Sequence, residues 1–303
     1  MALSIHTNYS SLVTQTNLGK TNNALGTNQQ RLGTGLRINS AADDAAGLQI
    51  ATRLNAQSRG MAVAMRNTND SVSMLQTAEG AFSEMTDILQ RMKDLATQGS
   101  NGTNSGSDLI ALQSEYDELG KEMSNIVKNT KYAGSNLFSD GTLTTGAGGK
   151  LSAAVDFQIG ASTSEKLSLN LSASLTALGT ALGNSSDTYT LATTPGVEIA
   201  STQVATTAAN TNANATIGVL ETALDAVGSL RASLGANINR LNHTANNLAN
   251  MRDNTEMAKG RIMDADFASE SATMTKNSML LQSGISMLKQ AGQMPGMVMS
   301  LLG

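Results

Sequence analysis

Apolar residues recur at alternating three- and four-residue intervals along three long segments, and this repeat constrains the fold more than any other feature. The N-terminal half carries the repeat over residues 54–96 and, after the polar break QGSNGTNSGSD (98–108), over residues 109–126. The C-terminal half carries it over residues 217–248. Such spacing places one apolar seam along a helix, and the seam must be buried against partner helices. The chain has only two prolines, so very long helices are allowed.

We therefore predict a mainly α fold, an elongated antiparallel helical bundle or coiled coil formed by pairing of the N- and C-terminal halves of the chain. The predicted seam residues of this bundle are Leu54, Leu75, Phe82, Leu89, Leu112, Leu119, Leu234, Leu241 and Leu248.

The two ends of the chain carry weaker versions of the same pattern. Their apolar positions are Ile5, Leu12, Leu18, Leu25, Leu32, Phe267, Met274, Leu281 and Leu288. The residues between them are mostly Asn, Thr, Gln, Gly and Ser, which give modest helix propensity and few charge pairs. Such helices are marginal alone, and we expect them to become ordered on a partner.

The middle of the chain, roughly 133–215, changes character. Residues 155–172 mix alternating apolar positions with β-branched and aromatic residues, which predicts short strands or a hairpin. Residues 183–215 are rich in Thr, Ala and Asn and have no period, which indicates a surface loop or a small insert. A small β section therefore separates the two helical halves.

Composition excludes several classes of function. A formal net charge of −4 at pH 7 gives no electrostatic footprint for nucleic acid. The chain has no cysteine, which excludes a disulfide scaffold and cysteine-based zinc sites. The first residues lack a basic region before an apolar run, so we expect no cleaved secretory signal peptide. The longest apolar run falls far short of a membrane span, so no membrane insertion is predicted.

The stretch LRINSAADDAAGLQIATRL (36–54) is the most polar cluster that could carry chemistry. Adjacent side chains on a helix point about 100° apart, so Asp43 and Asp44 do not converge on one ligand, and no histidine or third carboxylate lies nearby. We instead expect Asn39 or Ser40 to cap a helix and the two carboxylates to stabilise its first turn. The cluster is completed by two candidate charge partners, Arg37 and Arg53. No catalytic, cofactor or metal site is predicted.

Four stretches, in order along the chain, resemble the bacterial flagellins. They are QQRLGTGLRINSAADDAAGLQIATRL (29–54), FQIGA (157–161), LGANINRLNHTANNL (234–248) and GRIMDADFASESATMTKNSMLLQSGISMLKQAGQMPGMVMSLLG (260–303). The resemblance covers essentially the whole length, with a variable domain that is nearly absent.

The resemblance implies a division into domains. Residues 1–40 and 260–303 would form an inner terminal coiled coil, and residues 41–182 with 216–259 a helical rod with a β-hairpin. Residues 183–215 would be the reduced variable surface insert. The polar stretch would then be the joint between inner coil and rod, with Arg37, Asn39, Asp43 and Asp44 as its residues.

The resemblance also implies a role and partners. Flagellins polymerise into the extracellular helical filament used for swimming or swarming, so the first implied partner is a second copy of the chain. The family is exported unfolded through the flagellar type III apparatus, without a cleaved signal, and is added at the distal tip. An export chaperone, the filament cap and the hook-junction proteins are the other implied bacterial partners.

A further implied partner is the vertebrate Toll-like receptor for flagellin. The contact stretch of the family aligns with LQRMKDLATQ (89–98) and with the helix that follows. The matching residues are Gln90, Arg91, Leu95 and Glu115. Lys93 departs from the family's pattern, in which an arginine is common. Lysine cannot donate two hydrogen bonds in the fixed geometry of an arginine.

Three other classes of protein compete with this reading. A hook–filament junction protein shares the terminal helices but fits the compact middle less well. A chemoreceptor-like signalling coiled coil would be one continuous hairpin, which the β pattern over 155–172 contradicts. An enzyme is disfavoured, because no catalytic constellation is present in the sequence.

Overall fold

A computed structural model describes residues 8–139, 148–190, 196–199 and 206–302 of the chain. The chain divides into two compact units, and they are named here the terminal unit (Met1–Arg59 with Arg252–Gly303) and the central unit (Gly60–Met251). Each unit combines segments from both halves of the sequence. The fold is mainly α, with long helices and small antiparallel hairpins, which confirms the predicted fold class.

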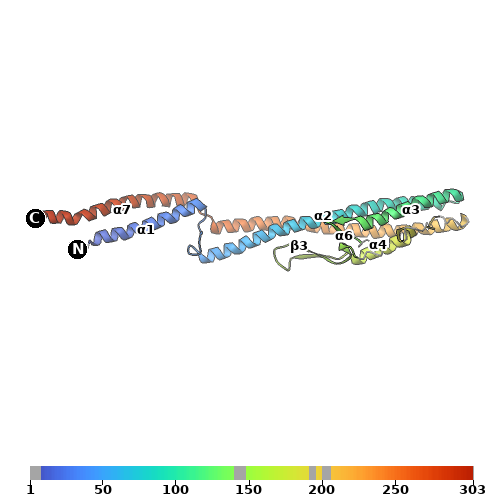
Figure 1. Cartoon of the computed structure of the whole chain (residues 1–303), viewed down its shortest axis with the longest axis horizontal. Coiled ribbons are helices and arrows are strands. Elements are labelled where there is room, and N and C mark those ends of the chain that lie inside the picture. Colours follow the sequence, from blue (N-terminus) through green and yellow to red (C-terminus); the bar gives the residue numbers. More distant parts are fainter. Residues whose placement is uncertain (1–7, 140–147, 191–195, 200–205, 303) are drawn as a thin grey trace. The chain divides into compact units, whose positions relative to one another are not determined.

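The helices of the terminal unit are α1 (Tyr9–Thr34), the first part of α2 (Ala45–Gly99), the last part of α6 (Thr206–Met263), and α7 (Phe267–Leu302). α1 begins at Asn8, whose side chain accepts a hydrogen bond from the N–H of Ser11 at 3.0 Å. This arrangement satisfies one of the free donors at the start of the helix. α1 and α7 lie side by side and antiparallel (Figure 1).

The central unit contains the remainder of α2 and α6 together with the elements between them. The third long helix, α3 (Gly106–Asn129), begins at a capping box in which Ser105 and Asp108 satisfy each other's backbone N–H groups. Two short hairpins follow, β1 (Lys131–Tyr132) with β2 (Ser135–Asn136) and β3 (Val155–Gln158) with β4 (Lys166–Leu169). The predicted hairpin over 155–172 is confirmed, with Phe157 paired to Leu167.

Between and after the hairpins lie short helices. A 3-10 turn, η1 (Lys150–Ser152), precedes β3, and α4 (Ser172–Ser185) with α5 (Asp187–Thr190) follows β4. Of the two alternatives for 183–215, the surface loop is wrong for the described residues, whereas the small insert stays a prediction. Ser186, Tyr189 and Ile199 are buried, and α6 already begins at Thr206.

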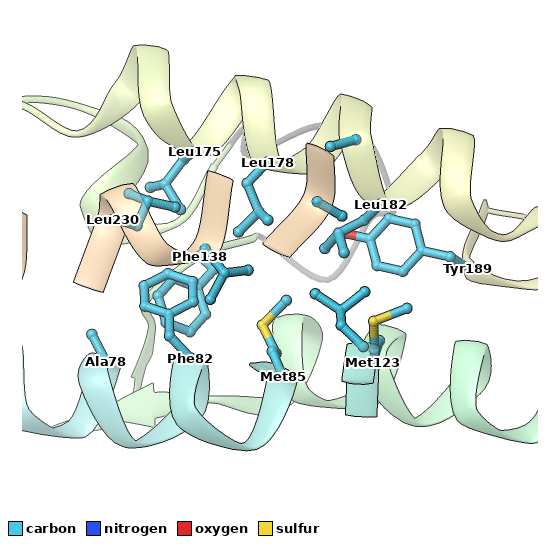
Figure 2. Packing of buried hydrophobic residues seen from close by; sticks show 14 of the residues in the cluster. Ala78, Phe82, Met85, Met123, Phe138, Leu175, Leu178, Leu182, Tyr189 and Leu230 are labelled. Atoms are coloured by element: carbon cyan, nitrogen blue, oxygen red, sulfur yellow. The ribbon is translucent and has the colours of Figure 1, made fainter. Parts of the chain in front are cut away.

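One apolar core runs through the central unit. Its side chains come from α2, α3, α4 and α6 and from the segments around the hairpins (Figure 2). The rings of Phe82 and Phe138 meet at its centre, with centroids 4.7 Å apart and planes tilted by 43°, a favourable arrangement for an aromatic pair. Ala78 on α2 is fully buried in the same core.

The structure buries most of the predicted seam residues. Those fully or almost fully buried are Leu75, Phe82, Leu89, Leu234, Leu241 and Leu248. Those that are half-buried are Leu54, Leu112 and Leu119. None of the described helices is long and apolar enough to cross a membrane.

The seam position Leu241 provides a test of this core. Its side chain on α6 is 0% exposed, so Leu241→Asp would bury an unpaired carboxylate and remove an apolar side chain. We expect the free energy of unfolding to fall by at least about 3 kcal/mol, measured by urea denaturation of the monomer followed by circular dichroism. The control is Asn242→Asp, which introduces the same charge at the exposed adjacent position. Equal stability of the two variants would contradict the seam assignment.

Candidate functional site

The two halves of the chain are hydrogen-bonded to each other where α1 ends and α7 begins. Gly35 ends α1 with a φ of +72°, a conformation that favours glycine. The backbone N–H of Ala265 donates to the carbonyl of Gly35 at 2.9 Å, and the N–H of Arg37 donates to Met263 at 2.6 Å. The guanidinium of Arg37 also donates to the carbonyl of Ile262 at 2.9 Å. The segments after α1 and before α7 therefore form one connected joint.

Two carboxylates organise the loop that leads from this joint into α2. The Asp43 carboxylate accepts from the N–H of Ser40 at 2.8 Å and from that of Asn39 at 3.0 Å. These donors, with the Ser40 hydroxyl, hold the pKa of Asp43 below its usual range. The Asp44 carboxylate accepts from the N–H of Gly47 at 2.8 Å. Asp44 thus caps α2, which begins at Ala45.

The structure corrects two expectations about this stretch. Asn39 and Ser40 do not cap α2, because the helix begins later, and the Asn39 amide donates instead to the carbonyl of Leu36 at 3.0 Å. Arg37 and Arg53 form no ion pair with Asp43 or Asp44. All four residues lie in the described part of the chain. Among the described residues no group of His, Cys, Asp or Glu is arranged to hold a metal ion.

The helix pair α1–α7 forms the larger part of the terminal unit. The Asn8 amide donates to the carbonyl of Ala291 at 2.6 Å near one end of the pair. Further along, Leu18 lies so close to Gly284 that a Cβ on the glycine would be 3.2 Å from Cγ of the leucine. The other predicted terminal residues that face into the pair are half-buried: Leu25, Leu32, Met274, Leu281 and Leu288.

Other apolar side chains of the terminal unit face away from this contact. Two of the predicted positions, Leu12 and Phe267, are 63% and 66% exposed. Among the described side chains of the unit, the other exposed large apolar residues are Tyr9, Val13, Met279, Leu280, Ile285 and Met287 on the pair, with Ile50 on α2 and Met257 on α6. The predicted residue Ile5 lies outside the described residues. A two-helix contact therefore buries only part of the apolar surface of these helices.

The stretch aligned with the receptor contact is only partly on the surface. Gln90 is exposed, and Arg91 forms an exposed ion pair with Glu115 on α3, with a Nη2–Oε1 distance of 2.6 Å. Leu95 is 1% exposed and packs in the core of the central unit. Three of the four matching residues are therefore exposed, and Leu95 is buried.

A buried polar network in the central unit was not predicted from the sequence. The Gln113 amide on α3 donates to Asp117 and to Glu198, at 2.8 Å in each case. The Glu198 carboxylate also accepts from the N–H of Asp187 at 2.5 Å. Burial raises the pKa of Glu198 despite these donors. Only the low polarity around Glu198 in the sequence hinted at its burial.

The hydroxyl of Tyr116 on α3 lies beside this network. It donates to the carbonyl of Ser185 at 2.5 Å, and burial, followed by the charges of Glu198 and Asp117, raises its pKa. This contact attaches the end of α4 to α3. The network is structural, because each of its polar groups is engaged by another part of the chain.

The chain matches two regions of one protein family. Residues 5–142 match the bacterial flagellin N-terminal helical region, and residues 217–302 match the bacterial flagellin C-terminal helical region. Both matched regions contribute to the terminal unit and to the central unit.

Proteins similar over their whole length include flagellin A of Vibrio anguillarum, 36% identical, and flagellin A of Vibrio cholerae, 35% identical. Each alignment covers 100% of both chains and runs over 389 positions, more than the 303 residues present here. These relatives therefore carry residues that have no counterpart in this chain, in agreement with a short form.

Two solved structures are also similar. The crystal structure of Bacillus cereus flagellin is 27% identical and covers 60% of this chain and 88% of its own, with a TM-score of 0.46. A Vibrio parahaemolyticus protein described as flagellar hook-associated is 13% identical, covers 73% of this chain and 100% of its own, and has a TM-score of 0.54. At that identity the second likeness concerns the fold alone.

The cap at Asp44 can be tested by comparing Asp44→Ala with Asp44→Asn. Alanine removes the acceptor for the Gly47 N–H, whereas asparagine keeps a side-chain oxygen in its place. We expect amide hydrogen exchange in the first turn of α2 to accelerate about fivefold in the alanine variant and to change little in the asparagine variant. Equal exchange rates in both variants and the unmodified chain would contradict the cap.

The raised pKa of Glu198 predicts a pH-dependent contribution to stability. A carboxyl whose pKa is higher in the folded than in the unfolded state stabilises the fold fully below its unfolded pKa, and this contribution is lost as pH rises through the folded pKa. Glu198→Gln does not ionise. We therefore expect its Tm, relative to that of the unmodified chain, to increase steadily from pH 4 towards neutral pH. A Tm difference that stays constant or declines over this range would contradict the assignment.

Proposed function

The chain belongs to the bacterial flagellin family, and from this premise we propose that its terminal helix pair is the element through which it polymerises. As a member of this family it is a structural subunit of the extracellular bacterial flagellar filament and not an enzyme. What remains to be assigned is which surfaces of this chain make the filament and how they are brought together.

The exposed apolar side chains of α1 and α7 carry the proposal. Phe267 and Met279 on α7 and Leu12 on α1 are each more than half exposed, although they lie on helices that already pair with each other. Scattered exposed apolar residues are ordinary, but most of the exposed large apolar side chains among the described residues lie on this one helix pair, and such a concentration indicates a protein contact. If neighbouring subunits cover this set by a contact that does not close into a ring, a helical filament results.

The composition of the same helices supports a delay of assembly until the growing end is reached. Helices rich in Asn, Thr, Gly and Ser are marginal when they are not packed. We propose that the chain is exported unfolded with the help of a chaperone and added at the distal tip beneath the cap. The first subunits would meet the hook-junction proteins, and the filament would serve swimming or swarming. Ordering of the terminal helices on neighbouring subunits would then contribute to the free energy of polymerisation.

We propose the domain roles on the same basis. Residues 1–40 with 260–303 would line the inside of the filament, residues 41–182 with 216–259 would form the rod, and residues 183–215 would be the reduced outer insert. The joint formed by Arg37, Asn39, Asp43 and Asp44 would connect the inner coil to the rod. Its support is the hydrogen bonding of the chain at the end of α1.

We also propose that the exposed surface of α2 and α3 is recognised by the vertebrate Toll-like receptor. Its support is the surface formed by Gln90 and the Arg91–Glu115 ion pair. Because the structure buries Leu95, that residue would act by holding α2 in place and not by direct contact.

Truncation tests the assignment of polymerisation to the helix pair. Removal of residues 1–35 deletes α1 and leaves the seam of α7 without its partner. Removal of residues 275–303 deletes most of α7. We expect each truncated protein to remain folded in the central unit, judged by its urea unfolding transition, and to form no filaments after salting-out.

Electron microscopy of the precipitated protein would provide the measurement, with the unmodified chain treated in parallel as control. Long helical filaments from either truncated protein would overturn the proposal. Absence of filaments from the unmodified chain would overturn it as well.

A further inference from the structure

The contact between α1 and α7 follows a seven-residue repeat on both helices. On α1 the residues that face the contact are Leu18, Thr21, Leu25, Asn28 and Leu32. On α7 they are Met274, Asn277, Leu281, Gly284 and Leu288. The distance between Leu18 and Gly284 fixes how the two sets are aligned. A seam of this kind leaves its register poorly defined, because a shift of one helix by one repeat brings seam positions opposite seam positions again.

Polar residues occupy one layer of this otherwise apolar or small seam. Asn28 is the buried residue of α1, with 5% of its surface exposed. The oxygen and nitrogen of an asparagine side chain are told apart by their hydrogen-bond partners. One orientation of the Asn28 amide gives both atoms suitable partners. In that orientation the nitrogen of Asn28 donates to Glu270 Oε1 at 2.9 Å, and its oxygen accepts from the Asn277 amide at 3.2 Å.

A charged pair borders the same layer. The guanidinium of Arg31 lies 3.9 Å from the carboxylate of Glu270, and both side chains are mostly shielded from solvent. The Glu270 carboxylate therefore accepts a hydrogen bond from Asn28 and forms an ion pair with Arg31. The Nε atom of Arg31 is buried and has no hydrogen-bond partner among the described residues. The layer is sensitive to displacement, because a buried polar group that loses its partner is strongly unfavourable.

A shift by one repeat would break this layer in either direction. In the structure Asn28 lies opposite Met274, between Asn277 and Glu270. A shift in one direction would bring Asn277 to the place of Glu270 and Gly284 to the place of Asn277, so that Asn28 and Arg31 would both lose the carboxylate. A shift in the other direction would bring Glu270 to the place of Asn277 and Met263 to the place of Glu270, so that Asn28 would lose its amide partner and Arg31 its ion pair. The apolar seam therefore leaves the register to directional contacts. These are the backbone hydrogen bonds of the joint at the end of the pair and, within the pair, the polar layer around Asn28.

We propose that Asn28 and Asn277 determine the register in which the two ends of the chain pair, and so select the arrangement of α1 and α7 that enters the filament. This inference rests on the proposed function, since it concerns the helix pair that polymerises. A buried asparagine at a seam position fixes register while it lowers the stability of the helix pair. Replacing Asn28 with leucine should therefore stabilise the helix pair and make its alignment less specific.

The absence of cysteine from the sequence allows the register to be read by disulfide cross-linking. Thr21→Cys is combined with Leu281→Cys for the register of the structure. It is combined with Leu288→Cys for a shift in one direction and with Met274→Cys for a shift in the other. Each pair is introduced into the full-length chain, alone and together with Asn28→Leu. Filaments are assembled and oxidised, and the intramolecular cross-link is quantified by its altered mobility on a denaturing gel.

With Asn28 in place we expect cross-linking only between positions 21 and 281. With Asn28→Leu we expect the ratio of shifted to unshifted cross-links to rise on the order of tenfold, because the shifted states no longer bury an unsatisfied amide at this position. The control is Asn22→Leu, which adds the same side chain at an exposed position of α1 and should leave the ratio unchanged. A variant that does not assemble alone is incorporated as a minor, labelled fraction into filaments of the cysteine-free chain.

The outcomes separate this inference from the proposed function. Failure of the unmodified chain to polymerise would overturn the proposed function. Filaments in which Asn28→Leu keeps the single cross-link between positions 21 and 281 would overturn the register assignment alone. An equal spread of cross-links in the Asn22→Leu control would also overturn it, because the effect would then come from added apolar surface and not from loss of the buried amide.

Discussion

The pairing of helices from opposite ends of the sequence is the constraint on which the rest of the structure depends. Neither half of the chain buries its own apolar seam, so α1 requires α7 and the central part of α2 requires α6. The shorter elements fill what the long helices leave open. The ring of Phe138 meets that of Phe82 from outside the helices, and α4 completes the core from the segment between the two halves.

The sequence predicted the structure well wherever the buried residues recur at regular intervals. The seven-residue spacing identified α2, α3 and α6 and most of their buried leucines, and alternation identified the hairpin of β3 and β4, because each periodicity belongs to one secondary structure. Periodicity alone did not separate the faces of a broad apolar helix. Leu95 was assigned to the surface through a resemblance and lies in the core, since α2 is packed on more than one side in the central unit.

Features determined by side-chain geometry could not be read from the sequence. Several residues before α2 have oxygens suited to capping, and only the path of the chain shows that Asp44 is the one that accepts from the helix N–H. The segment with α4 and α5 has small residues and no charge pattern, so its burial against Tyr116 and Gly120 depends on the neighbouring α3. Likewise Asn28 looks like one of many polar residues until Asn277 and Glu270 are seen beside it.

The two units therefore use polar groups in different ways. In the central unit Gln113, Asp117 and Glu198 attach a short segment to a core whose arrangement is already fixed by large apolar side chains. In the terminal unit the apolar side chains are fewer, regularly spaced and partly exposed, so they provide attraction without specifying an alignment. In the proposed assembly the helix pair forms late, beside many identical copies of itself, and it would then need directional contacts to specify its alignment. The amide layer at Asn28 supplies such contacts at the one place in α1 where a side chain is buried.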